Sequence, residues 1–212
     1  KKIGDQLIET IMTHLPLNNK KAKRKALNCL EEVGINPDRF NAYPHEFSGG
    51  MRQRVVIALA LSAEPDLIIA DEPTTALDVS VQEQVLNILK KTCKHRNASV
   101  ILITHDMGVI SETTDRVAVM YAGRLVEIGK TEEILKAPKH PYTRGLIAST
   151  PSVEHGDIST ELYQIKGTMP RLDSLPSGCS FNPRCEKAID ICKESHPEML
   201  DNGVACWIFT DE

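Results

Sequence analysis

The sequence predicts an α/β fold in which a helical segment precedes a mostly parallel sheet. Apolar residues recur at helical spacing in residues 1–62, short apolar runs alternate with helical stretches in residues 63–137, and prolines interrupt the pattern from residue 138 onward. Apolar strands that alternate with helices are typical of a parallel sheet. We therefore expect three parts: a helical subdomain at 1–62, an α/β core at 63–137 and a small extension at 138–212.

Three helices are expected in the helical subdomain. The first ends before Pro16. Asn18 or Asn19 is suited to cap a second helix that reaches about Val33, and Gly34 follows as a C-terminal stop. The third helix begins after a Ser-Gly-Gly turn and ends at about residue 62.

In the α/β core, short apolar runs predict buried parallel strands. The expected elements are a strand at 67–70, a helix at 79–95, a strand at 99–104, a helix at 107–113, a hairpin of 117–121 and 125–128, and a short helix at 131–136 capped by Thr131. Polar residues follow both of the first two strands, at the strand ends where open α/β sheets bind ligands.

The composition is ordinary for a globular protein. Of 212 residues, 41% are hydrophobic and 25% are charged, and the formal net charge is −4 at pH 7. This charge gives no indication of a nucleic-acid surface, so no nucleic-acid partner is expected. No apolar run approaches the roughly 20 residues that cross a bilayer, and no signal peptide opens the chain, so membrane association is expected to come through a partner.

A Ser-Gly-Gly turn opens the third helix. Ser48, Gly49 and Gly50 stand directly before an amphipathic run. Glycines let backbone N–H groups approach an anion closely, and the positive end of a helix adds to the attraction. The turn therefore predicts a phosphate-binding cradle.

Two adjacent carboxylates end the first apolar strand. Asp71 and Glu72 follow residues 67–70, and Asp78 and His105 come further along the chain. At a strand end, one carboxylate can hold Mg²⁺ while the other orients a water molecule. Ordinary structural interpretations remain open as well: the carboxylates can cap a turn, Asp78 can cap the next helix, and His105 can bond to the backbone.

The order of these motifs resembles that of the ATP-binding-cassette (ABC) ATPases along the whole chain. The matching segments are Ser48-Gly49-Gly50 (their signature motif), Asp71-Glu72 (their second nucleotide motif), Ala76-Leu77-Asp78 (their D-loop) and His105 (their switch histidine). The resemblance implies an ATPase that uses ATP and Mg²⁺. In it, Glu72 would activate the attacking water, Asp71 would bind Mg²⁺ through water, and His105 would contact the γ-phosphate.

In this family two ATPase subunits pair head to tail. Ser48, Gly49 and Gly50 would therefore bind the ATP of the opposite subunit, and Asp78 would report across the subunit interface. No G-x-x-x-x-G-K-[ST] phosphate loop occurs in the chain. The resemblance thus implies the second half of a P-loop ABC ATPase core, and this piece alone is not expected to hydrolyse ATP.

The detailed sequences of three segments resemble the branch of this family that serves oligopeptide, dipeptide and nickel importers. These segments are residues 48–54, residues 140–146 and the stretch that begins at Gly178-Cys179. They imply the ATP-binding subunit of a peptide importer on the cytoplasmic face of the cell membrane. Its expected partners are a second, non-identical ATPase subunit, two membrane permeases and, indirectly, an extracytoplasmic peptide-binding protein.

Alternatives to peptide import stay open. A nickel importer ATPase is the nearest variant, and a soluble ABC ATPase of DNA repair or translation is a second one. A regulatory metal module on an inert half-cassette is a third interpretation, which depends on the absent phosphate loop.

Four of the six cysteines lie in the proline-rich extension. Cys179, Cys185, Cys192 and Cys206 are spaced C-x₅-C-x₆-C-x₁₃-C. This spacing lacks the short C-x₂₋₄-C pairs of most structural zinc sites, whereas iron–sulfur clusters tolerate wide spacing. The resemblance to importer ATPases likewise implies a [4Fe–4S] cluster, and zinc or free thiols remain alternatives.

Overall fold

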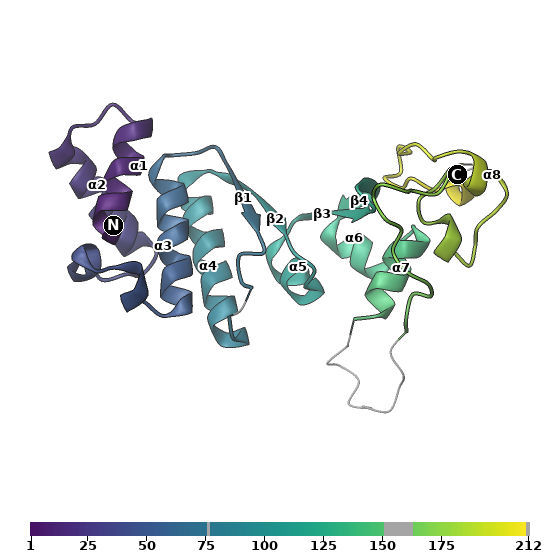
Figure 1. Ribbon diagram of the computed structural model, residues 1–212, viewed down its shortest axis with the longest axis horizontal. Helices are drawn as coiled ribbons and strands as arrows, with labels where there is room; N and C mark the ends of the chain where they lie inside the picture. Colours follow the sequence, from purple (N-terminus) through teal and green to yellow (C-terminus); the bar gives the residue numbers. More distant parts are fainter. Residues whose placement is uncertain (76, 151–162, 211–212) are drawn as a thin grey trace. The chain divides into compact units, whose positions relative to one another are not determined.

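The computed structural model describes residues 1–75, 77–150 and 163–210, and the chain divides into two compact units, Lys1–His105 and Asp106–Glu212 (Figure 1). Each unit has a hydrophobic core of its own. The predicted divisions near residues 62 and 137 mark functional subdomains and stay predictions.

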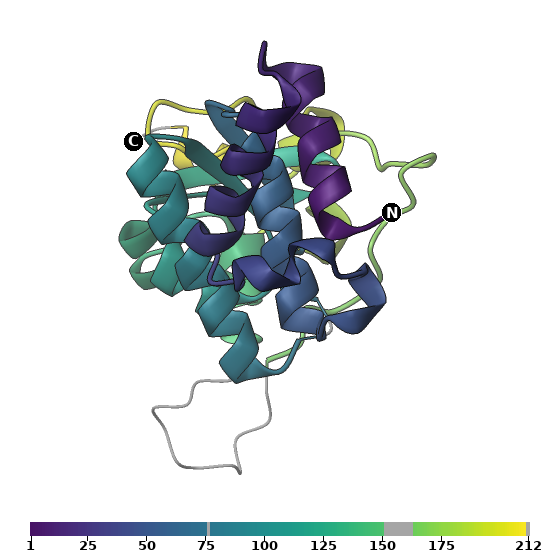
Figure 2. The same cartoon turned by 90° about the vertical axis from the view of Figure 1, so that its left-hand side faces the viewer.

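The first unit is mainly helical. Its helices are α1 (Ile3–His14), α2 (Asn19–Glu32), α3 (Gly49–Ser62) and α4 (Val79–Arg96), with short 3₁₀ turns at Pro37–Asn41 and Pro44–Glu46. The boundaries follow the local chemistry: Asn18 accepts a hydrogen bond from the Lys21 amide at 3.0 Å, and Gly34 leaves the helix with a φ of +71°. These helices pack into one core, and Figure 2 shows α3 and α4 lying side by side.

A two-stranded parallel sheet completes this unit. Strands β1 (Leu67–Asp71) and β2 (Ser99–Ile103) pair in register from Leu67 with Ser99 to Asp71 with Ile103. The strands were predicted to be buried, and this prediction is wrong for the chain described here, because Ile69 is 65% exposed and Ile101 is 50% exposed. A parallel strand is covered only when elements lie on both of its faces, and the described residues leave one apolar face of this sheet open.

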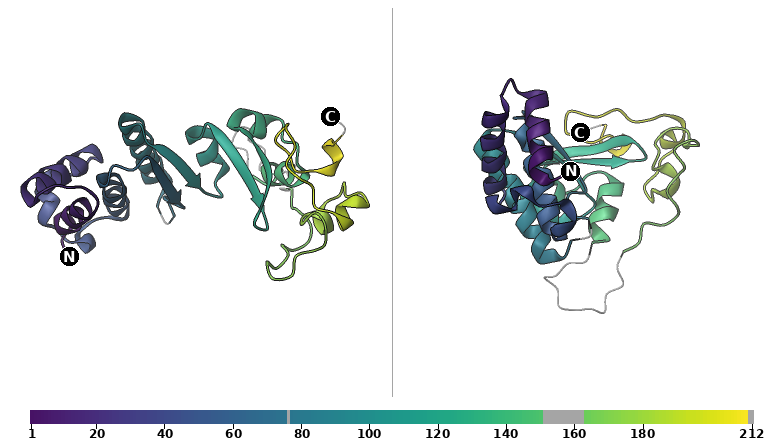
Figure 3. Two further views of the ribbon diagram at one scale, coloured as in Figure 1. Left: turned by 90° about the horizontal axis from the view of Figure 1, so that it is seen from above. Right: turned by 60° about the vertical axis from the view of Figure 1, so that its left-hand side comes forward.

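The second unit is built on a hairpin. Its elements are α5 (Met107–Thr113), β3 (Arg116–Tyr121), β4 (Arg124–Lys130), α6 (Thr131–Lys136), α7 (Pro141–Ala148), α8 (Ile191–Glu194) and 3₁₀ turns at Asn182–Arg184 and Trp207–Phe209. β3 and β4 pair antiparallel around Ala122 and Gly123, which both have positive φ (Figure 3). The predicted α/β character therefore holds, with one parallel and one antiparallel pair among the described residues.

A buried carboxyl group binds the backbone of the segment that leads into α7. Glu127 is 1% exposed, and its side-chain oxygens accept hydrogen bonds from the amides of Lys139 and His140 at 2.7 and 3.0 Å. His140 in turn caps α7, because its Nδ1 accepts from the Tyr142 amide at 3.0 Å. Burial lowers the pKa of His140 to about 4, which keeps the ring neutral near pH 7.

Two local features differ from the sequence expectations. Thr131 was predicted to cap α6, but it is the first residue of that helix and its hydroxyl donates to the Thr114 carbonyl at 2.8 Å. Helix α7 was not predicted, because prolines near it hid its short periodicity. Among the residues that the structure describes, no helix has both the length and the apolar character of a membrane span.

Candidate functional site

Glu72 and His105 meet at the carboxyl edge of the parallel sheet. Because β1 and β2 end at the same level, the residues that follow them lie together, and His105 Nδ1 donates to Glu72 Oε1 at 2.6 Å. The Glu72 amide donates to the Ile103 carbonyl at 2.9 Å, so the chain leaves β1 still attached to β2. Glu72 has a φ of +47°, a conformation unusual for a residue with a side chain. This backbone turn directs its carboxylate to His105.

The electrostatics of the pair favour an ionised carboxylate. The hydrogen bond from His105, followed by that from the Thr75 hydroxyl at 2.9 Å, lowers the pKa of Glu72. The His105 side chain is 87% exposed. Asp71, one residue earlier, is also exposed. This edge therefore presents two carboxyl groups and an imidazole to a ligand. Exposed carboxylate oxygens are donors that suit Mg²⁺.

The Ser-Gly-Gly turn opens α3 as predicted. Ser48 Oγ accepts from the Met51 amide at 3.4 Å and serves as the N-cap. A Cβ atom on Gly50 would lie 2.3 Å from Val81 Cγ1, and one on Gly49 would lie 3.2 Å from Leu77 Cδ2. Packing against the start of α4 thus accounts for the absence of a side chain at Gly50. The fold alone explains this glycine, whether or not the turn also binds phosphate.

Asp78 caps α4. Its Oδ1 accepts from the Val81 amide at 3.0 Å and from Ser80 Oγ at 2.8 Å. The Val81 hydrogen bond, with the Ser80 bond second, lowers the pKa of Asp78. The structural interpretation of Asp78 is confirmed, and a role across a subunit interface stays a prediction.

Thr75 was missed by sequence reasoning. Its hydroxyl bonds to Glu72 three residues earlier, and only the Glu-x-x-Thr spacing around Pro73 could have indicated it. Leu77 and Val81 were missed in the same way, because their contact with the glycine turn depends on how α3 and α4 pack.

The four cysteines of the extension lie near one another. Burial raises the pKa of Cys206 to about 11, and the three other thiols, Cys179, Cys185 and Cys192, add to the rise. The Cys179 amide donates to the Cys192 carbonyl at 2.8 Å, and all of these cysteines are free thiols. In the part of the chain that the structure describes, no three His, Cys, Asp or Glu side chains are placed to hold a metal ion.

Comparisons with known proteins agree with this geometry. Residues 3–75 match the model of the family described as ABC transporter, and residues 126–192 match the oligopeptide/dipeptide transporter C-terminal region. Among solved structures, cbiO1 from Clostridium perfringens, part of an ABC transporter complex, is 26% identical with a TM-score of 0.58 over 64% of this chain and 53% of its own. A dimeric ATP-binding cassette with bound ADP and Pi is 28% identical with a TM-score of 0.54 over 61% of this chain and 56% of its own. The matching family model and the fold thus define an ABC-type chain.

Curated relatives narrow the family. The oligopeptide transport ATP-binding protein AppD of Bacillus subtilis is 46% identical over 99% of this chain and 65% of its own length. The dipeptide transport ATP-binding protein DppD of the same organism is 47% identical over 97% of this chain and 63% of its own length. The chain belongs to the family of oligopeptide and dipeptide transport ATP-binding proteins. It spans a little under two thirds of the length of these relatives.

Proposed function

We propose that this chain is part of the ATP-binding subunit of an ABC importer, in which ATP hydrolysis energises the uptake of di- or oligopeptides. The observation that carries the proposal is the Glu72–His105 pair at the carboxyl edge of β1 and β2, in a chain whose relatives are named for peptide transport. Nickel import is the nearest alternative, and no contact in the described residues favours it.

Each residue at the edge of the sheet has a different proposed role. Glu72, kept ionised by His105 and Thr75, is placed to accept a proton from, and orient, an attacking water. Asp71 offers an exposed carboxylate that would hold Mg²⁺. When bound, the metal neutralises charge on the transferred phosphoryl group. His105, whose side chain lies at the surface, is proposed to contact the γ-phosphate.

Ser48, Gly49 and Gly50 are proposed to act on the nucleotide of a second subunit, with Asp78 near the same interface. The dimeric state of the solved ATP-binding cassette supports pairing in this family. The proposed partners are a non-identical ATPase subunit, two membrane permeases and an extracytoplasmic peptide-binding protein. The proposed location is the cytoplasmic face of the membrane. Hydrolysis is expected only where a phosphate loop is present, since these 212 residues contain none.

The test is ATP hydrolysis and peptide uptake by the assembled transporter. Glu72→Gln keeps the size of the side chain and removes the base, so turnover is expected to fall by about 10² to 10⁴-fold while ATP binding persists. Glu132→Gln, an exposed carboxylate of α6, is the matched control and should retain full activity. Unchanged hydrolysis in Glu72→Gln would contradict the assignment. Uptake of nickel in place of peptides would support the alternative.

We also propose that Cys179, Cys185, Cys192 and Cys206 hold a metal centre, with a [4Fe–4S] cluster preferred to zinc. Support comes from their proximity and from a donor set of four thiols, which such clusters use. Burial raises the pKa of the Cys179, Cys185 and Cys206 thiols, so metal binding would release protons from them.

Metal and acid-labile sulfide analysis of protein purified without oxygen distinguishes the forms. About four iron and four sulfide per chain indicate the cluster, and about one zinc per chain indicates the alternative. A metal-free protein would refute both. Cys206→Ser should reduce the bound metal, whereas Cys93→Ser, in the core of the first unit, should leave it unchanged.

A further inference from the structure

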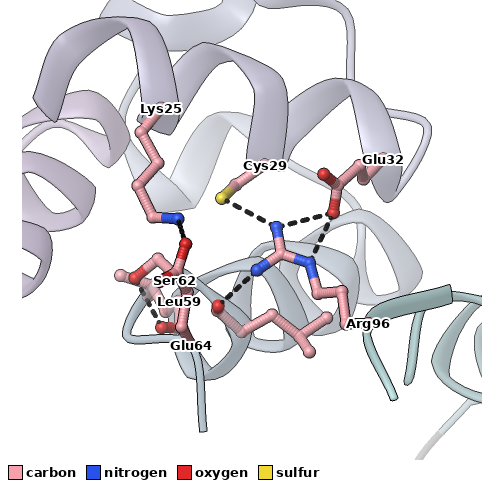
Figure 4. Close-up of polar contacts among 8 residues, drawn as sticks. Lys25, Cys29, Glu32, Leu59, Ser62, Glu64 and Arg96 are labelled. Atoms are coloured by element: carbon pink, nitrogen blue, oxygen red, sulfur yellow. Dashed lines mark hydrogen bonds and ion pairs between the residues drawn. The ribbon is translucent and has the colours of Figure 1, made fainter. Parts of the chain in front are cut away.

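Arg96, the last residue of α4, is held between three helices of the first unit (Figure 4). Its Nε and Nη2 donate to Glu32 Oε2 at 2.9 and 2.7 Å, and its Nη1 donates to the Leu61 carbonyl at 2.7 Å. Nη2 also lies 3.4 Å from Cys29 Sγ. Glu32 and Cys29 belong to α2 and Leu61 to α3, so a single guanidinium connects α4 to both helices.

The chemistry of this joint requires arginine. A planar guanidinium can serve a carboxylate with two donors and a carbonyl with a third, which an ammonium group cannot do in one position. The Leu61 carbonyl belongs to the last turn of α3, where carbonyl groups lack helical partners and a positive charge is favourable. Burial raises the pKa of the Cys29 thiol, so the sulfur is a neutral neighbour and Glu32 supplies the opposite charge. The Arg96 side chain is only 17% exposed, which limits screening by solvent.

The other end of α4 meets the Ser-Gly-Gly turn. Gly50 approaches Val81 so closely that a Cβ atom would overlap it, and Arg54 Nη2 donates to Gln84 Oε1 at 2.8 Å. Helix α4 is 18 residues long, or about 27 Å at 1.5 Å per residue. α3 and α4 are therefore connected near the start of both helices and again near their ends.

We propose that Arg96 is a positioning residue for the nucleotide reaction. By fixing the last turns of α2 and α3 to the end of α4, it holds the two helix starts, at Ser48 and Asp78, at a constant spacing. This inference rests on the proposed function, because those two turns matter only if they face a nucleotide. Arg96 itself touches neither turn and acts through the paired helices.

The Lys25–Glu64 ion pair provides a matched comparison. It joins α2 to the segment that follows α3, as Figure 4 shows, and it includes no residue of α4. Lys25→Ala thus removes a charged contact on the same side of the unit without releasing α4. Arg96→Ala and Lys25→Ala should differ if the joint to α4 is what matters.

Nucleotide kinetics of the assembled transporter test the proposal. Arg96→Ala is expected to raise the KM for ATP about fivefold, because a displaced turn weakens closure on the nucleotide, while kcat changes less than about twofold. Arg96→Lys should recover part of the shift, and Lys25→Ala should show none. A lower kcat at unchanged KM would overturn the proposal, since that result marks a loss of folded protein. A wild-type transporter that does not hydrolyse ATP would overturn the proposed function instead.

Hydrogen exchange of the protein without nucleotide tests the same joint independently of activity. Glu32→Gln keeps the side-chain volume and one acceptor, so it should fold even if Arg96→Ala does not. In Glu32→Gln, the amides of Arg52 and Gln82 are expected to exchange at least about tenfold faster than in the wild type. These amides close the first turns of α3 and α4. Faster exchange confined to residues 29–34 and 61–64 would overturn the proposal.

Discussion

His105 and His140 each lie beside a glutamate, but in opposite environments. His105 is 87% exposed and contacts the Glu72 side chain directly, whereas the buried His140 presents its backbone amide to Glu127 and its ring to the Tyr142 amide. The side chains of the exposed pair lie at the surface of the first unit. The polar atoms of the buried pair are occupied by backbone groups. The same residue types therefore form a candidate site at a strand edge and a structural joint in a core.

The largest effect is expected from the buried joint. Glu127→Ala leaves the amides of Lys139 and His140 without acceptors inside the second unit. Each unpaired buried donor costs about 2 kcal/mol, so the free energy of unfolding should fall by about 4 kcal/mol. Urea unfolding followed by circular dichroism measures the change.

Glu133→Ala is the control for that variant, because Glu133 lies on α6 of the same unit and pairs with Lys130 at the surface. It should leave unfolding unchanged within error. Equal stability of Glu127→Ala and the wild type would show that water replaces the carboxyl group and that the joint is not needed.

Protonation of His140 should have the next largest effect. The folded protein keeps His140 neutral down to about pH 4, whereas the unfolded chain takes up a proton near pH 6.5. Between these values the unfolded state binds more protons, so the free energy of unfolding falls as the pH is lowered, by about 3 kcal/mol in total. His140→Asn keeps an acceptor for the Tyr142 amide and should flatten this slope. A slope that survives in His140→Asn would assign it to another group.

Local sequence signals predicted the helices of the first unit well. The Asn18 cap, the Gly34 stop and the glycine turn before α3 each depend on neighbours within a few residues, and all three are present. Burial of the strands was predicted wrongly, because it depends on which elements cover both faces of the sheet. Helix α7 depends on Glu127, a residue distant in sequence, and such contacts leave no periodic pattern.

The candidate site was predictable in its residues but not in its geometry. The sequence placed Glu72 and His105 after two strands, at the end where such sheets bind ligands, and the structure adds that their side chains are in contact. The supporting contacts of Thr75 and Val81 depend on the turn after β1 and on helix packing, which no short motif encodes.

Gly50→Ala separates packing from ligand binding in the exposed site. The added methyl group would overlap Val81 Cγ1, so the free energy of unfolding should fall by about 2 kcal/mol. Val81→Ala makes space, and the double variant should be more stable than the sum of the two single changes predicts. If the double variant regains stability but the transporter remains inactive, Gly50 serves the nucleotide as well as the fold. Additive effects would show that the two side chains do not meet.

The smallest effect is expected from His105→Ala, which should alter the charge behaviour of Glu72 without altering the fold. Loss of the 2.6 Å hydrogen bond removes the main cause of the lowered pKa, so the pKa of Glu72 should rise toward its usual value, while the bond from Thr75 retains part of the shift. Carboxyl-carbon NMR during a pH titration measures the change directly, and Thr75→Val should produce a smaller rise. The thermal midpoint should stay unchanged, because both side chains lie at the surface. An unchanged pKa of Glu72 in His105→Ala would show that the exposed pair is not formed in solution. The exposed pair would then differ from the buried pair in being disordered as well as in being exposed.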